Sequence, residues 1–201
     1  YSEIAIGEPV QAFMNVLQDE FSGLGKDVTE ENLQARSRGV ILMAISNKKG
    51  AMLLTTGNKS EMSVGYATLY GDMAGGFAPI KDVSKLNVFA LANFRNSISP
   101  AIPQRVIDRP PSAELAPDQK DEDSLPPYEI LDPILEMYIE QDLSVTEIID
   151  NGFDEEAVKR VTWLVDMSEY KRRQSPPGVR VTQRAFGKER RYPITSGFKR
   201  S

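Results

Sequence analysis

A short polar corner at residues 55–61 carries the side chains in this sequence that are best suited to bind phosphate and a metal ion. It reads TTGNKSE and so combines hydroxyls, a lysine and a carboxylate. An apolar run at 52–54 precedes the corner, and Gly50 precedes that run. This pattern predicts a short buried strand at residues 51–55. Where a strand ends and a helix begins, free backbone N–H groups and the helix dipole point to one place, and α/β proteins bind anionic ligands there. The corner is therefore a candidate nucleotide site.

More polar residues follow the corner. Residues 70–72 read YGD, two glycines follow at 75–76, and Asp82 and Lys85 come next. Each feature also has an ordinary structural explanation, because Gly-Asn and Gly-Asp are common turn dipeptides and Ser60-Glu61 could begin a surface helix. Residue types alone therefore leave both interpretations open.

The succession of unusual residues from 55 to 85 resembles a known family. The signature of NAD synthetases, members of the N-type ATP pyrophosphatase superfamily, is similar to the run TTGNKSEMSVGYATLYGDMAGGFAPIKDVSK. The resemblance continues upstream in ENLQARSR (31–38). Downstream, the closing segments of the glutamine-dependent branch resemble RPPSAEL (109–115), EYKRRQ (169–174) and PPGVRVTQRAFGKERRYPIT (176–195). The resemblance covers most of the chain and is least diagnostic between residues 132 and 166.

This resemblance implies a ligase that forms NAD+ by ATP-dependent amidation of deamido-NAD+. ATP adenylates the nicotinate carboxylate and releases pyrophosphate, and ammonia derived from glutamine then displaces AMP. The implied co-substrate is ATP, and the implied metal is Mg²⁺. The chemistry depends on neutralising phosphate charge and on placing two nucleotides accurately. It requires no side chain that titrates near neutral pH, which agrees with a sequence that has no His.

On the ATP side, the resemblance implies three residues. Thr56 matches the ATP contact at the strand end, and Lys85 matches the lysine that meets the ATP phosphates and is the implied catalytic residue. Ser112 lies where the family places a hydroxyl near the phosphates. Because Ser112 stands in a Pro-rich loop, an ordinary loop position is an open alternative for it.

On the dinucleotide side, the resemblance implies that Asn32, Arg36 and Lys171 face deamido-NAD. Glu61 matches the family's acidic position near both the dinucleotide and the metal, and a carboxylate there can coordinate Mg²⁺. Lys171 also belongs to a basic run, so a solvated surface position is an alternative for it.

The sequence departs from the family pattern in informative places. The ammonia-dependent branch often has a lysine at the position of Leu69, an acid near Gly76 and a histidine at Tyr170, and these differences favour the glutamine-dependent branch. The superfamily's phosphate loop, Ser-Gly-Gly-x-Asp-Ser, is absent, and so is a glutamine-hydrolysing domain. We therefore expect an incomplete portion of the enzyme that is inactive by itself and needs an upstream phosphate-loop segment and a glutaminase domain.

Two alternatives from other functional classes stay open. The chain could be a non-catalytic fragment that binds a dinucleotide and contributes to an oligomer. It could also belong to an ATP pyrophosphatase that adenylates a different carboxylic acid, since the adenylating chemistry alone permits this.

Composition excludes several kinds of site. The sequence of 201 residues has no Cys and no His, so it cannot form disulfides, thiolate or imidazole zinc sites, or His-based triads. No apolar run approaches the roughly 20 residues that span a bilayer, and no secretory signal pattern opens the chain. We expect a cytoplasmic protein without membrane contact.

The net charge of −5 conceals a strong asymmetry. From Lys171 onward Glu189 is the only acid among many Lys and Arg residues. A basic tail can bind nucleic acid, but this tail lacks interleaved readout features, and we expect no nucleic-acid partner. A solvated terminus, or a segment that folds over a phosphate-rich site or a neighbouring subunit, is the alternative. We expect a homo-oligomer.

The elements that must position these residues are predicted from periodicity and capping. Helices at about 7–21, 30–46 (with Thr29 as its N-cap) and 83–96 surround the strand at 51–55, an order typical of half of a doubly wound α/β fold. The resemblance implies an adenine nucleotide α-hydrolase-like parallel sheet with a helical C-terminal extension. We divide the chain into an α/β portion at 1–96, a mobile Pro-rich loop at 97–132, and C-terminal helices and a basic tail at 133–201.

Three cap signals organise the C-terminal portion. Asp132 before Pro133 predicts an N-cap and a helix to about residue 141. Ser144 and Glu147 have the spacing of a capping box, and Asp154 is predicted to cap a final helix.

Overall fold

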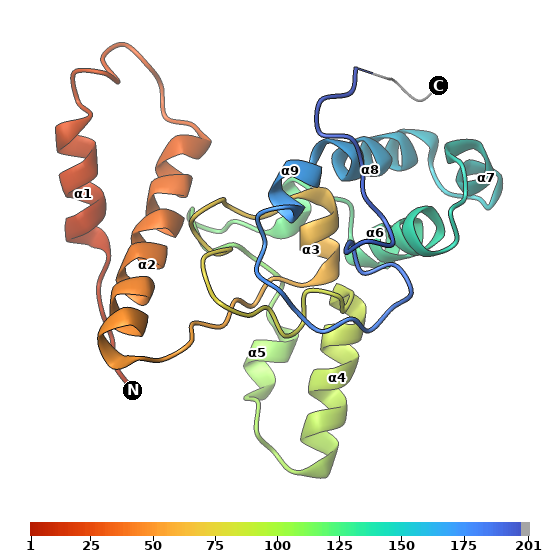
Figure 1. The fold of residues 1–201 in the computed structure, drawn as a ribbon, viewed down its shortest axis with the longest axis horizontal. Coiled ribbons are helices and arrows are strands. Elements are labelled where there is room, and N and C mark those ends of the chain that lie inside the picture. Colours follow the sequence, from red (N-terminus) through yellow and green to blue (C-terminus); the bar gives the residue numbers. More distant parts are fainter. Residues whose placement is uncertain (198–201) are drawn as a thin grey trace.

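The computed structural model describes residues 1–197, which fold into helices joined by long irregular segments (Figure 1). Helices α1 and α2 run antiparallel on one side, α4 and α5 project from the centre, and α6, α7 and α8 form the other side (Figure 1). In chain order the elements are α1 (Gly7–Val16), α2 (Val28–Lys49), α3 (Lys59–Val64), α4 (Lys85–Ile98), α5 (Gln104–Asp108), η1 (Asp121–Asp123), α6 (Tyr128–Leu135), η2 (Glu136–Glu140), α7 (Val145–Asp150), α8 (Glu155–Met167) and α9 (Glu169–Arg172). No helix among the described residues is both long and apolar enough to cross a membrane.

The hydrophobic core lies where α6, η2, α7 and α8 meet. Val158, Val161 and Val165 of α8 are completely buried, because their i, i+3, i+7 spacing places them on one face of the helix. The predicted caps of this region are confirmed. Ser144 forms the capping box with Glu147 at the start of α7, and the Asp154 carboxylate accepts a hydrogen bond from the backbone N–H of Ala157 at the start of α8.

The predicted N-cap role of Asp132 is wrong. Helix α6 begins at Tyr128, and Asp132 and Pro133 lie inside it. The Asp132 carboxylate instead accepts a hydrogen bond from the backbone N–H of Leu86 at 2.9 Å and another from the hydroxyl of Ser60. The side chain therefore serves the first turns of α3 and α4 and not the start of its own helix.

The predicted parallel sheet is not present as strands in residues 1–197. Residues 53–55 are extended, but only Leu54 forms an isolated parallel bridge, to Phe77. The backbone N–H of Thr55 donates to Phe77 O at 2.9 Å, and that of Gly76 donates to Leu53 O at 2.9 Å. The prediction of a buried strand is wrong for most of the segment, since Met52 is 69% exposed and Leu54 54% exposed. One parallel neighbour is too little to form a ladder, because parallel pairing needs several covered strands.

The Pro-rich segment at 97–132 contains more regular structure than the sequence predicts. Helix α5 and the 3₁₀ turn η1 form within it, and α6 crosses its predicted end. Its mobility stays a prediction.

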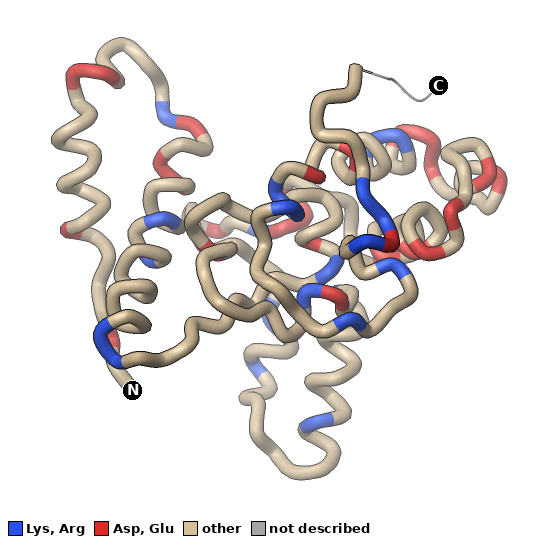
Figure 2. The backbone as a smooth tube through the Cα atoms, in the orientation of Figure 1, with Lys and Arg blue, Asp and Glu red and all other residues tan. Residues whose placement is uncertain are grey.

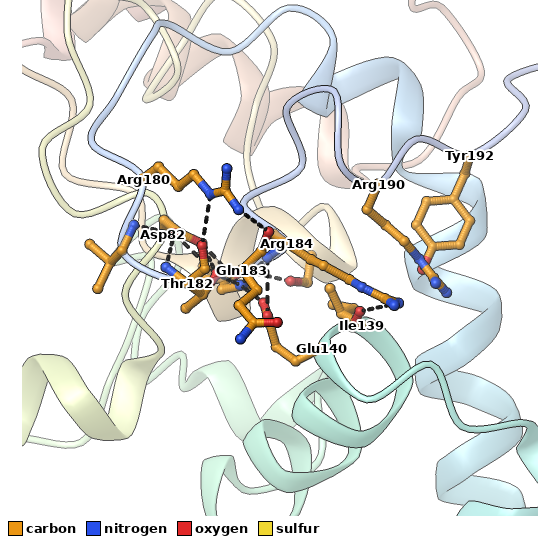
Figure 3. A network of polar contacts seen from close by, with 12 residues as sticks. Asp82, Ile139, Glu140, Arg180, Thr182, Gln183, Arg184, Arg190 and Tyr192 are labelled. Atoms are coloured by element: carbon orange, nitrogen blue, oxygen red, sulfur yellow. Dashed lines mark hydrogen bonds and ion pairs between the residues drawn. The ribbon is translucent and has the colours of Figure 1, made fainter.

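The basic C-terminal segment lies across α3 and the central loops (Figure 1). Figure 2 shows its Lys and Arg residues beside the acidic α6–α7 region. Asp82 binds this segment through its carboxylate, which accepts hydrogen bonds from the backbone N–H groups of Val181 and Thr182 at 2.6 and 2.7 Å (Figure 3). Glu140 accepts a third from the backbone N–H of Arg184 at 3.0 Å. The ammonium of Lys59 lies between both carboxylates.

We predict that Gly39→Ala destabilises the protein, although an interior helical Gly→Ala change ordinarily stabilises a helix by about 1 kcal/mol. A Cβ at Gly39 would lie 2.8 Å from Tyr70 O and 3.1 Å from Gly71 O, so α2 would have to move away from this loop. Overpacking of this kind costs about 1–3 kcal/mol. Thermal unfolding measures the change, with Gly25→Ala as the control, since a Cβ there meets nothing within 4 Å. Equal unfolding midpoints for both variants would refute the close contact.

We also predict an acid-sensitive attachment of the tail. Burial raises the pKa of Asp82 and of Glu140, but hydrogen bonds from the tail and the Lys59 ammonium outweigh it, so both pKa values lie below their ordinary range. A depressed carboxyl pKa stabilises the folded state above the unfolded pKa, about 3.9 for Asp and about 4.3 for Glu, and this stability is lost as the pH falls through the folded value.

Asp82→Asn should therefore be less stable at neutral pH and should lose less stability than the wild type as the pH falls from about 5 to about 3. The unfolding temperature as a function of pH measures this. Asp19→Asn, at an exposed position, is the control and should keep the wild-type slope. An unchanged slope in Asp82→Asn would show that the carboxylate contributes no pH dependence.

Candidate functional site

A cleft of about 760 Å³ opens between α2, the corner at 53–57 and the loop at 112–124. Its lining includes six of the seven site residues that the resemblance implies, namely Asn32, Thr56, Glu61, Lys85, Ser112 and Lys171. Arg36 does not line it, and the Nε atom of Arg36 donates to Leu69 O at 3.2 Å. A second cavity of about 590 Å³ on the other side of Gly39 has no charged residue in its lining. The larger cleft is therefore the candidate site.

Glu61 is fixed by the start of α3. Asn58 is the N-cap, and its side-chain oxygen accepts a hydrogen bond from the Glu61 backbone N–H at 3.0 Å. Glu61 Oε2 in turn accepts from the Asn58 backbone N–H at 3.1 Å, which completes a capping box. Glu61 Oε1 is left for Lys85, whose ammonium lies 2.8 Å away. The local sequence NKSE therefore aims one carboxylate oxygen at the lysine.

Lys85 is held by the start of α4. Its backbone N–H donates to the Ser60 hydroxyl oxygen at 2.9 Å. Its ammonium lies 5.3 Å from the centre of the Tyr128 ring and 4.0 Å from Asp121 Oδ2. The side chain is only 17% exposed, so its charge acts where water screens it weakly.

Asp121 is the cleft residue that the sequence reasoning missed. It is 3% exposed, and its Oδ2 accepts a hydrogen bond from the Tyr128 hydroxyl at 2.7 Å. Its Oδ1 is the one buried side-chain nitrogen or oxygen in residues 1–197 without a hydrogen-bond partner. Burial and the Asp121 charge together raise the pKa of Tyr66 and of Tyr128, so both phenols stay neutral. In the sequence, Asp121 belongs to an acidic run at 118–123, shortly after Ser112. The Pro-rich surroundings of this run predicted a loop and not a site.

The opposite wall of the cleft is polar, and most of its polar groups form hydrogen bonds with one another. Asn32 Oδ1 accepts from the Thr68 hydroxyl at 2.9 Å, and Asp72 Oδ1 accepts from the Thr68 backbone N–H at 2.7 Å. Lys171 Nζ donates to Gly65 O at 2.6 Å and to Ala67 O at 2.7 Å. Burial lowers the pKa of Lys171, and the charge of Asp72 partly opposes this. Burial likewise raises the pKa of Asp72, against the Thr68 N–H bond.

The other predicted residues are Thr56, Ser112 and Arg36. Thr56 is exposed, and the Ser112 hydroxyl accepts from the backbone N–H of Glu114 at 3.0 Å. Arg38 lines the cleft where the sequence predicted Arg36. Two positions along a helix turn a side chain through about 200°, so only one of these arginines can face the cleft.

The carboxylates of Glu61 and Asp121 fit a hard cation that takes only one or two of its ligands from the protein. No group of three or more His, Cys, Asp or Glu residues within 1–197 is arranged around a metal position. Glu61 and Asp121 nevertheless both approach the Lys85 ammonium, and Asp121 Oδ1 has no partner. Mg²⁺ is usually bound through one or two carboxylates with phosphates and water completing its shell. These two residues fit that arrangement.

Comparisons with known proteins give a consistent result. A family model described as NAD synthase matches residues 1–175. The chain is 60% identical over 192 residues to a curated glutamine-dependent NAD(+) synthetase of Acinetobacter baylyi, which covers 94% of this chain and 36% of that protein. The chain thus spans about a third of the length of the curated relatives it matches.

Two solved structures extend the comparison. The glutamine-dependent NAD+ synthetase of Acinetobacter baumannii in complex with ADP has a TM-score of 0.52 at 54% identity and covers 98% of this chain and 35% of its own. A glutamine-dependent NAD(+) synthetase of Cytophaga hutchinsonii has a TM-score of 0.76 at 26% identity, over 98% of this chain and 34% of its own. The fold of the described residues is similar to that of NAD synthetases.

We predict opposite effects of Asp121→Asn on stability and on nucleotide binding. The amide keeps an acceptor for the Tyr128 hydroxyl and removes the charge of an unpartnered buried oxygen, whose burial costs on the order of 1–3 kcal/mol. The ligand-free protein should therefore unfold at a higher temperature, while calorimetry should show at least about tenfold weaker binding of ATP with Mg²⁺, a loss of about 1.4 kcal/mol. Glu122→Gln, exposed and adjacent, is the control. Wild-type affinity in Asp121→Asn would show that the free oxygen faces no ligand.

Proposed function

Since this chain belongs to the NAD synthase family, we propose that the complete protein is a glutamine-dependent NAD synthetase. The observation that carries the proposal is the Lys85–Glu61 pair in a charged cleft that Asp121 also lines. A cation flanked by carboxylates, at the first turns of two helices, suits the binding of phosphate groups with a divalent metal.

The proposed reaction has two steps. An oxygen of the nicotinate carboxylate of deamido-NAD attacks the α-phosphorus of ATP, and pyrophosphate leaves. Ammonia then attacks the carbonyl carbon of the adenylate, AMP leaves, and the nitrogen loses a proton to form the amide. The ADP bound to the relative from Acinetobacter baumannii supports an adenine nucleotide as the partner of this cleft.

We assign the residues by what each can supply. Lys85 neutralises negative charge on the phosphates, and preorganised charges of this kind act without reorganisation during the reaction. Thr56 and Ser112 offer hydroxyls at the ATP side. Asn32 and Lys171 offer donors to deamido-NAD. Arg36 would contribute indirectly, because its Nε donates to Leu69 O and so supports the loop that contains Leu69. Mg²⁺ when bound supplies further charge neutralisation, and Glu61 and Asp121 would hold it.

The proposal extends to the architecture of the complete protein. The parallel bridges at Leu54 and Ala78 support an edge of a doubly wound sheet, with further strands pairing where Met52 and Leu54 are exposed. We also propose a phosphate loop and a glutaminase domain elsewhere in the complete chain, a homo-oligomeric state and a cytoplasmic location.

An assay of the complete protein tests the function. With ATP, Mg²⁺, deamido-NAD and either glutamine or ammonia, we expect NAD, AMP and pyrophosphate in equal amounts. Binding of deamido-NAD without any turnover would favour the non-catalytic alternative. Pyrophosphate release only with a different carboxylic acid would favour the other ATP pyrophosphatase.

We predict that Glu61→Gln and Lys85→Ala each slow adenylation in the complete enzyme. Glutamine keeps an oxygen that can accept the hydrogen bond from the Asn58 backbone N–H, so α3 should stay folded while the charge is lost. Removing one preorganised electrostatic contact typically lowers the rate by on the order of 10²-fold or more. Pyrophosphate release measures the step, and Lys159→Ala, on the exposed face of α8, is the control. Rates within about threefold of the wild type would show that these side chains are structural.

A further inference from the structure

The part of the basic tail at residues 176–197 contacts other parts of the protein but does not reach the cleft. None of residues 176–197 lines the cleft. Its arginines bind backbone carbonyl groups instead: Arg180 donates to Thr182 O and Gln183 O, and Arg184 donates to Ile139 O at 3.1 Å (Figure 3). Arg190 likewise donates to Tyr138 O at 3.2 Å. Arg184 and Arg190 therefore attach the segment to the body of the protein, whereas Arg180 binds carbonyl groups within the segment itself.

One buried ammonium organises this attachment. Lys59 is 7% exposed, and its Nζ lies 2.9 Å from Asp82 Oδ1, 2.6 Å from the Thr182 hydroxyl and 3.2 Å from Arg184 O. It also forms an ion pair with Glu140. The Thr182 hydroxyl is in turn 2.9 Å from Asp82 Oδ1. One lysine thus joins the start of α3, the loop before α4, the end of η2 and the tail.

The positions of these residues in the sequence connect the network to the candidate site. Lys59 is the first residue of α3, which carries Glu61, and Asp82 lies in the turn that leads into Lys85. The backbone N–H of Lys59 also donates to Val83 O at 2.8 Å. Lys59 and Asp82 thus lie two residues before Glu61 and three residues before Lys85, so the network adjoins both site residues.

We propose that Lys59 is a positioning residue and that the tail is a clasp, which together hold Glu61 and Lys85 at their working separation. Asp82 and Glu140 carry two negative charges against the single charge of Lys59, and the tail supplies the remaining hydrogen-bond donors through the backbone N–H groups of Val181, Thr182 and Arg184. A buried carboxylate at Asp82 and a half-buried one at Glu140 need this many partners, so the tail cannot detach without loosening the corner. The proposal rests on the function proposed above for Glu61 and Lys85.

Beside the clasp, the backbone of the tail at Pro177 and Gly178 lies close to the backbone at Ala78. Ala78 N–H donates to Pro177 O at 2.9 Å, and a Cβ on Gly178 would lie 2.3 Å from Ala78 O. Lys81 Nζ binds Ser175 Oγ at 2.8 Å and Pro176 O at 2.7 Å. The tail is thus held on both sides of Asp82, which makes this turn the place where its attachment is transmitted to Lys85.

The test uses the complete enzyme with Lys59→Met, which keeps an unbranched side chain one atom shorter and removes the charge. Lys188→Met, an exposed lysine of the same tail, is the matched control. Hydrogen exchange by mass spectrometry reports on residues 59–66, 82–88 and 178–184, and steady-state kinetics report kcat and KM. We expect faster exchange in all three segments and a kcat lowered at least about tenfold, with KM values within about threefold, because a misplaced group costs rate more than binding.

Thr182→Val is a second, milder variant in case Lys59→Met fails to fold. It keeps both ion pairs and removes one hydroxyl that lies more than a hundred residues from Glu61 in the sequence. We expect faster exchange at 178–184 and at 82–88, and a kcat lowered several-fold.

The two readouts separate the possible outcomes. Faster tail exchange with wild-type kcat would overturn the positioning role, since the tail would then be attached without influencing the site. A lowered kcat with unchanged exchange at 59–66 and 82–88 would overturn the clasp as its cause. A wild-type enzyme that forms no NAD would refute the proposed function, and exchange at Glu61 and Lys85 would then decide the clasp alone.

Discussion

The buried carboxylate of Asp132 is the constraint on which the candidate site depends. It is 7% exposed and receives donors from two other helices, the Ser60 hydroxyl of α3 and the Leu86 backbone N–H of α4. Burial raises its pKa, and these donors, with the more distant charge of Lys85, oppose the increase. Because an unsatisfied buried carboxylate is costly, α3 and α4 must keep their first turns against α6. Glu61 follows Ser60 and Lys85 precedes Leu86 in the sequence. The Asp132 junction therefore places the two helix starts beside each other, and the proposed clasp at Lys59 acts on the same two turns.

Local rules predicted part of this arrangement and long-range contacts decided the rest. Caps at Ser144 and Asp154 could be read from the sequence because each depends on residues within one turn. The same rule failed at Asp132, whose partners are 46 and 72 positions away, and no local pattern carries that information. The buried strand at 51–55 failed for a related reason, since an apolar run specifies burial but not the neighbours that provide it.

The resemblance identified which residues lie near the cleft better than it identified which side chains face it. Six of the implied residues come together there, although their roles stay predictions. Arg36 and Arg38 show the difference: both are arginines on α2, and helical geometry gives the cleft to Arg38. The acidic run marks the neighbourhood of Asp121 but not Asp121 itself, because what distinguishes it is an unpartnered oxygen, a property that exists only after Tyr128 and Lys85 have been placed around it.

In the ligand-free cleft, both lysine ammonium groups already have partners within the protein, so a ligand that binds them must replace those partners. The Lys85 ammonium is paired with Glu61, and the Lys171 ammonium is bound to the carbonyls of Gly65 and Ala67. A phosphate that recruits Lys85 has to replace an ion pair, and Mg²⁺ at Glu61 and Asp121 would take the place the ammonium leaves. Binding of anion and cation together adds less net charge to a poorly screened site than binding of the anion alone. Under the proposed function, ATP and its metal would therefore enter as one unit, and Lys85 would exchange a carboxylate for a phosphate.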